Sequence, residues 1–123
     1  MTRPTGGGSG RDPDGVSRYL IVPLLILLVG LVYAQVARHA FIVIDDHLYV
    51  TANAPVRAGL TPEGFLWAFT TLHAFNWHPL TWLSHMLDVE LYGMRAGGHH
   101  LTSAVIHALS SVLLYLVLRR ATG

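Results

Sequence analysis

Side chains that can do chemistry are concentrated in residues 39–100, between two apolar runs. This segment contains five of the chain's seven acidic residues, seven of its eight histidines and all three tryptophans. Carboxylates and imidazoles transfer protons, bind cations and form hydrogen bonds with polar ligands. We therefore expect the function to lie in this segment and the flanking apolar runs to act as anchors.

Two adjacent carboxylates, Asp45 and Asp46, follow the apolar tetrad FIVI. Neighbouring side chains point apart in an extended segment and diverge by about 100° in a helix, so the pair is not expected to share one proton. One carboxylate can face a site while the other caps, pairs or binds a cation. A solvated turn after a membrane helix explains the same pair, and the sequence alone leaves both interpretations open.

The histidines match no familiar metal motif. The imidazoles that could act as ligands are those of His47, His73, His78, His85, His99 and His100. The chain has no HExxH sequence, and the spacing of His73 and His78 does not place them on one helix face. We therefore expect no metal site, and a hydrogen-bonding or interfacial role for these rings fits better. A histidine-rich metal-binding loop stays open as an alternative.

The sequence GGHH, residues 97–100, directly precedes the second apolar run. Free amides and the helix dipole at such a position favour anions, so a phosphate could dock there. The two glycines could equally serve only to turn the chain back into the membrane. Deeper in the run, His107 is an ionisable group whose transfer into lipid is energetically unfavourable. This predicts partner helices or a hydrogen bond from His107 to Ser103 or a neighbouring helix.

The composition points to a bilayer and excludes several classes of protein. The chain is 52% apolar and 12% charged, with a mean hydropathy of +0.46. The absence of cysteine excludes disulfide scaffolds, thiolate zinc sites and cysteine nucleophiles. A net charge of +1, with no lysine, provides no field that would attract nucleic acid.

Two apolar runs must anchor the polar segment. Residues 19–37 carry no charged side chain and would form a helix about 28 Å long, close to the hydrocarbon thickness of a bilayer. Residues 100–118 form a second run without a formal charge apart from its histidines. A signal peptide cleaved after Ala34 is the alternative for the first run.

Two short amphipathic patterns lie between the runs, over about 62–75 and 79–92. Thr61 precedes the first of them and predicts an N-cap, followed by a proline and an acid in the first turn. Apolar residues recur at helical spacing in both, and Trp77 and Trp82 are expected to be interfacial aromatics. Both helices are therefore predicted to lie along the membrane surface.

The predicted fold is an all-α membrane protein with two transmembrane helices and an external loop. Its parts are a disordered cytoplasmic tail over 1–18, transmembrane helices over 19–37 and 100–118, the loop over 38–99 and a cytoplasmic end over 119–123. Arginines flank the two runs on their outer sides, whereas the loop carries three arginines against five acids. The positive-inside rule then places both termini in the cytoplasm and the loop in the periplasm, or in a lumen if the source is eukaryotic.

The runs DDHLYVTAN, WAFTTLHAFNWHPLTWLSHMLDVELYG and GGHHLTSAVIHALSSVLL resemble the amino-terminal part of a family of bacterial membrane proteins. These are relatives of the transmembrane and tetratricopeptide-repeat O-mannosyltransferases, in the GT-C glycosyltransferase superfamily. The resemblance covers about residues 19–118. It implies a bacterial inner-membrane enzyme with part of a GT-C fold, whose first external loop carries an acidic motif.

The resemblance implies that a sugar passes from a polyprenyl-phosphate donor to an acceptor hydroxyl. Asp45 would then be the general base and Asp46 would support it. From the electrostatics of the helix end, we assign Arg95, His99 and His100 to a lipid-linked phosphate. No resident cofactor is expected, and the need for a divalent cation stays open.

The family's longer members have many more spans and commonly carboxy-terminal tetratricopeptide repeats. We therefore expect this chain to be a truncated, inactive fragment that needs the bilayer and further transmembrane helices, from the missing remainder or from a partner membrane protein. The alternative is a small non-catalytic two-span protein whose loop binds a partner.

Overall fold

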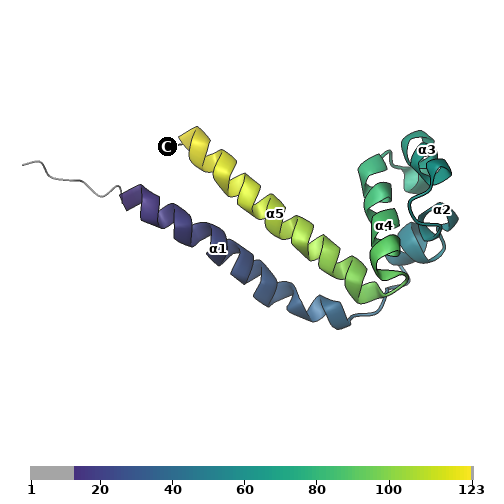
Figure 1. The fold of residues 1–123 in the computed structure, drawn as a ribbon, viewed down its shortest axis with the longest axis horizontal. Coiled ribbons are helices and arrows are strands. Elements are labelled where there is room, and N and C mark those ends of the chain that lie inside the picture. The colour runs from purple at the N-terminus through teal and green to yellow at the C-terminus, as the bar shows by residue number, and fades with distance from the viewer. Residues whose placement is uncertain (1–12, 123) are drawn as a thin grey trace, which may run out of the picture.

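In the computed structural model the described residues, 13–122, are mostly helical, with no strand among them. Two long helices, α1 (Pro13–Tyr33) and α5 (Ala96–Thr122), lie side by side and antiparallel (Figure 1). The segment that joins them folds into a group of short helices at the end of the hairpin far from the C-terminus. The prediction of an all-helical chain with two long apolar helices is confirmed.

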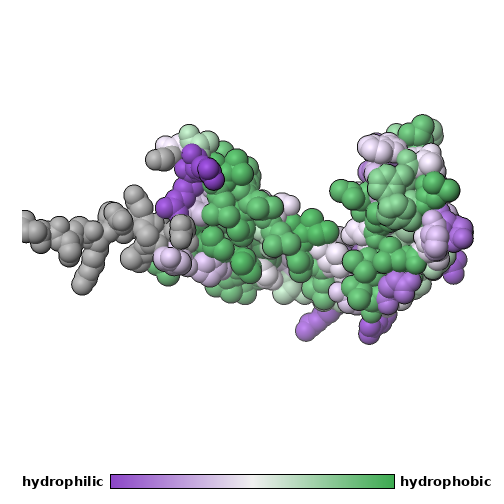
Figure 2. Space-filling view, turned by 45° about the horizontal axis from the view of Figure 1, so that its top comes forward, coloured by the Kyte–Doolittle hydropathy of each residue, from purple (hydrophilic) through white to green (hydrophobic). Residues whose placement is uncertain are grey.

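The two long helices leave their apolar side chains uncovered. A 3-10 turn, η1 (Ala34–Arg38), extends α1, and the stretches Tyr19–Arg38 and Ala96–Thr122 are long and apolar enough to cross a membrane. The apolar windows of both have no residue buried inside the molecule. Figure 2 shows the resulting hydrophobic surface along the hairpin. So large an exposed apolar area is rare in a water-soluble domain and typical of a surface that contacts lipid or other proteins.

The short elements between the long helices follow in sequence order. They are a π-helical turn η2 (His47–Thr51), α2 (Ala54–Arg57), α3 (Pro62–Thr70), a 3-10 turn η3 (His73–Phe75) and α4 (Pro79–Tyr92). The Thr61 hydroxyl accepts a hydrogen bond from the Gly64 N–H at 2.9 Å, so the N-cap predicted at Thr61 is confirmed. This bond satisfies one of the amides that a helix start leaves unpaired.

The short helices pack around a small core centred on Trp82. The buried apolar residues are Val50, Val56, Ala68, Trp82 and Met86. The Trp82 indole stacks on Tyr49 at a centroid distance of 5.0 Å and meets Trp67 at 5.2 Å. Burying such side chains contributes roughly 1.5–3 kcal/mol each, so Trp82 is the main anchor of this unit.

The burial of Trp82 corrects one prediction. Trp82 is 0% exposed and belongs to the core, whereas Trp77 is 62% exposed. The prediction that Trp82 is an interfacial aromatic is therefore wrong. Its face of α4 is covered by α2, α3 and the η2 turn, and the apolar pattern of α4 alone does not reveal that cover.

Several helix ends differ from the predicted ones. Residues 13–18 belong to α1 although a disordered tail was expected over 1–18, and residues 1–12 lie outside the described part of the chain. The amphipathic helix expected over about 62–75 ends at Thr70, because Thr71 is extended, with φ −85° and ψ 149°; beyond it, Ala74 and Phe75 have positive φ angles of 56° and 60°. Such φ angles cannot continue a right-handed helix.

The GGHH sequence lies inside α5, and Gly93 makes the turn that precedes it. Gly93 follows α4 with a φ of 60°, a conformation that glycine adopts without strain. Gly97 allows close approach, because a Cβ there would overlap the carbonyl oxygen of Ala37. Gly97 and Gly98 both lie within α5, which begins at Ala96 rather than residue 100. A Cβ on Gly98 would overlap the Tyr92 ring at the end of α4, so both glycines permit close packing beside this turn.

Candidate functional site

An open cleft of about 420 Å³ lies where η1 and the following loop meet the first half of α5. Its lining residues are Tyr33, Val36, His39, Ala40, Ile42, Asp46, His100, Ser103, Ala104 and His107. The polar groups among them are one carboxylate, three imidazoles and two hydroxyls. These groups come from two stretches that lie far apart in the sequence, 33–46 at the end of α1 and in the loop, and 100–107 in α5.

Asp46 is the carboxylate of this cleft. It is half-buried, and its Oδ2 accepts a hydrogen bond from the Ile42 N–H at 2.9 Å. This bond fixes the carboxylate on the turn that precedes η2 and leaves the other oxygen available to a ligand. Asp45 is exposed and does not line the cleft. The neighbouring acids thus point to different surroundings, as expected for adjacent residues.

Two histidines reach the cleft from α5. His100 Nε2 lies 3.4 Å from the Ala40 carbonyl oxygen, which places its ring against the loop. His107 lies further along α5 and packs edge-on against the Tyr33 ring of α1 at 5.3 Å. This ring contact with the neighbouring helix is not the hydrogen bond predicted for His107, which stays a prediction together with the partner helices.

Two of the predicted phosphate-binding residues lie elsewhere. Arg95 is exposed, and its Nε donates to the Tyr92 carbonyl at 3.1 Å. His99 is buried, at 4% exposure, and neither residue lines the cleft. Of the five residues predicted to form the site, the cleft unites Asp46 and His100. The roles assigned to all five remain predictions.

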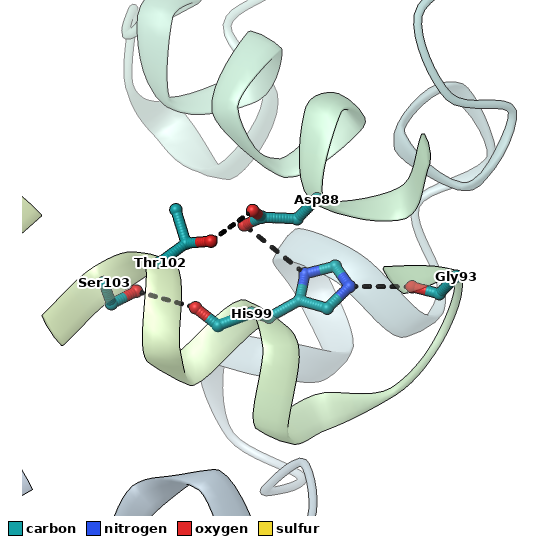
Figure 3. Close-up of polar contacts among 5 residues, drawn as sticks. All are labelled: Asp88, Gly93, His99, Thr102 and Ser103. Atoms are coloured by element: carbon teal, nitrogen blue, oxygen red, sulfur yellow. Dashed lines mark hydrogen bonds and ion pairs between the residues drawn. The ribbon is translucent and has the colours of Figure 1, made fainter. Parts of the chain in front are cut away.

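A second polar cluster joins α4 to α5 and combines His85 and His99, two of the histidines considered above as metal ligands, with Asp88, which no prediction assigned to a site. His85, Asp88 and His99 each present a nitrogen or oxygen atom, and these atoms lie within 4.8 Å of one another. Figure 3 shows Asp88 of α4 facing His99 and Thr102 of α5. The Thr102 hydroxyl donates to Asp88 Oδ1 at 2.6 Å. The sequence carried one signal for this cluster, the spacing H-x-x-D at 85 and 88, which places both residues on one face of α4.

The protonation of His85 is set mainly by burial. Burial lowers the pKa of His85 below its ordinary value of 6.5; the nearby Asp88 carboxylate opposes this shift and His99 adds to it. His85 is therefore neutral at pH 7 and its nitrogen lone pair is available. Asp46 also raises the pKa of His85, which places the cluster within electrostatic reach of the cleft.

An aromatic side chain connects the two sites. The Phe41 ring meets His99 at 5.2 Å and His100 at 5.9 Å, so it separates the buried histidine from the one that lines the cleft.

Comparisons of the chain with protein-family models, with curated proteins and with solved structures find no match.

Proposed function

We propose that this chain is the acidic-loop hairpin of a bacterial membrane glycosyltransferase with a GT-C fold. The enzyme would transfer a sugar from a polyprenyl-phosphate donor to an acceptor hydroxyl. The observation that carries the proposal is the Asp46 carboxylate, fixed in an open cleft between two helices that are apolar enough to span a membrane. The resemblance of residues 19–118 to the O-mannosyltransferase relatives supplies the reaction.

The membrane placement rests on the two long helices. α5 has 27 residues and is about 40 Å long, which exceeds the hydrocarbon thickness of a bilayer. Arg119 and Arg120 lie in its last turn. With α1 and α5 antiparallel, the positive-inside rule supports a topology in which both termini would lie in the cytoplasm and the cleft at the periplasmic surface of the inner membrane.

Asp46 is the general base in this proposal. Its Oδ2 is engaged by the Ile42 amide, so the remaining oxygen can accept the proton of an acceptor hydroxyl. Asp45, which the family resemblance assigned as the base, lies outside the cleft. The cleft therefore favours Asp46 for the proton and leaves Asp45 the supporting role.

His39 and His100 would face the lipid-linked phosphate in the cleft. Both are imidazoles that can donate a hydrogen bond to a phosphate oxygen, and both lie near the loop end of the hairpin, where a lipid headgroup would be. The exposed apolar faces of α1 and α5 would be covered by lipid and by further transmembrane helices. Activity is accordingly expected in the native membrane assembly.

The test compares carboxylate variants in membranes of the source organism. The organism's own copy of the gene is deleted, and each variant is expressed in its place. Transfer of radiolabelled mannose from polyprenyl-phosphate mannose to an acceptor is the readout, and immunoblotting measures the amount of chain. Asp46→Asn should abolish transfer, because an amide cannot accept the proton. Glu63→Gln, which changes an exposed carboxylate outside the cleft, is the matched control and should retain it.

The outcome with Asp45→Asn distinguishes the two acids. If Asp45→Asn abolishes transfer while Asp46→Asn does not, the base is Asp45 and the assignment from the cleft is wrong. Normal transfer in both variants would remove the proposed chemistry from this loop.

A further inference from the structure

We propose that His85, Asp88 and His99 bind a divalent transition-metal ion at the junction of α4 and α5. The inference is independent of the proposed glycosyltransferase activity. It rests on the geometry of the three side chains, on two buried nitrogen atoms without a hydrogen-bond partner, and on the contacts that orient the ligands.

The three ligand atoms are close to the spacing that a metal ion requires. They lie within 4.8 Å of one another, and Asp88 Oδ2 is 3.7 Å from His99 Nδ1. Ligands at about 2.0–2.1 Å from a tetrahedral zinc ion lie about 3.4 Å apart. A small movement of the His85 and His99 rings therefore brings all three atoms into coordination distance.

Two buried ring nitrogens among the described residues have no hydrogen-bond partner in this cluster. They are Nδ1 of His85 and Nδ1 of His99, and the His99 side chain is only 3% exposed. The 3.7 Å separation of His99 Nδ1 from Asp88 is too long for a hydrogen bond. Leaving buried polar atoms unsatisfied costs about 1–3 kcal/mol each, and a metal ion between them would remove that cost.

The remaining contacts orient the ligands in the way that metal sites require. His99 Nε2 lies 2.9 Å from the Gly93 carbonyl oxygen, so Nε2 carries the proton and Nδ1 carries the lone pair (Figure 3). Thr102 donates to Asp88 Oδ1, which leaves Oδ2 toward His99. Such outer hydrogen bonds fix the tautomer and the ring direction of metal-binding histidines.

Two imidazoles and one carboxylate select for a particular class of metal. This set suits first-row ions such as Zn²⁺ and Fe²⁺, whereas Mg²⁺ prefers oxygen ligands. Three protein ligands leave at least one coordination position for water or another small ligand. His85 is only partly buried, which gives that position a route to solvent.

The experiment measures zinc binding to the full chain purified in detergent and stripped with a chelator. Isothermal titration and elemental analysis should find about one Zn²⁺ per chain. Cobalt in place of zinc should give the visible absorption of a site of low coordination number, and Mg²⁺ should not compete. His85→Asn should weaken zinc binding by more than about tenfold while circular dichroism stays unchanged.

His78→Asn is the matched control. His78 is also half-buried and, like His85, packs on Tyr49, but it is not part of the cluster. It should retain the wild-type affinity. Asp88→Asn provides a second ligand variant that is expected to lose binding.

Two results would overturn the proposal. One is the absence of saturable zinc binding to the wild-type chain at micromolar concentrations. The other is equal binding by wild type, His85→Asn and Asp88→Asn, which would locate the ion elsewhere and make the cluster a metal-free contact between α4 and α5.

Discussion

Replacing Thr102 with valine removes the only hydroxyl that donates to the buried Asp88 carboxylate in the described part of the chain. The bond is short, 2.6 Å from Thr102 Oγ1 to Asp88 Oδ1, and Asp88 is 2% exposed. Valine keeps the shape of threonine, so the change deletes the hydrogen bond and creates little cavity. Water cannot replace the hydroxyl without opening the contact between α4 and α5.

The expected cost follows from the charge and the burial of Asp88. A hydrogen bond to a charged group contributes about 1.5–3 kcal/mol, and its loss leaves a buried carboxylate oxygen unsatisfied. We therefore expect Thr102→Val to destabilise the α4–α5 junction by about 2 kcal/mol, which increases its opening equilibrium about 30-fold. In an Asp88→Asn background the same substitution should cost only about 1 kcal/mol, because the acceptor is neutral.

Amide hydrogen exchange of the full chain in detergent and chelator measures this opening. Peptides covering 84–102 should exchange faster in Thr102→Val than in the wild type. Their exchange rate should be unchanged in the control Thr70→Val, which deletes an exposed hydroxyl bonded to the Leu66 carbonyl within α3. Equal exchange in wild type and Thr102→Val would refute the assignment of a charge-assisted bond at this junction.

Three further variants test the packing. Gly97→Val should separate η1 from α5, because its Cβ would meet the Ala37 carbonyl, and exchange in the first turns of α5 should then rise; unchanged exchange would contradict this close approach. Trp82→Ala should destabilise the group of short helices by about 3–5 kcal/mol, seen as lost near-ultraviolet circular dichroism, and a retained spectrum would remove Trp82 from the core. Because Trp77 is exposed, brominated lipids should quench part of the tryptophan fluorescence, and the Trp77→Phe variant should lack this quenched part. Equal quenching in the wild type and the variant would show that Trp77 does not contact lipid.

The long helices and the first cap were predictable because their signals are local. An apolar run without charges specifies a long apolar helix, and the cap at Thr61 depends on neighbouring residues alone. Trp82 shows the limit of such reasoning. Whether it faces lipid or a core depends on where α2, α3 and η2 pack, and the apolar spacing of α4 is compatible with both.

The two polar sites were harder to predict because each needs a tertiary contact. The choice between Asp45 and Asp46 depends on the turn before η2, where the Ile42 amide selects Asp46. The cluster of His85, Asp88 and His99 exists because the turn at Gly93 brings the start of α5 against the end of α4. The spacing of histidines along the sequence contains no information about that turn.

The most direct test of the proposed function is the rate of sugar transfer by Asp46→Asn in native membranes, normalised to the amount of chain and compared with Glu63→Gln. We expect transfer at background level for Asp46→Asn and at the wild-type rate for Glu63→Gln. Wild-type transfer by Asp46→Asn would show that the carboxylate of the cleft is not the base.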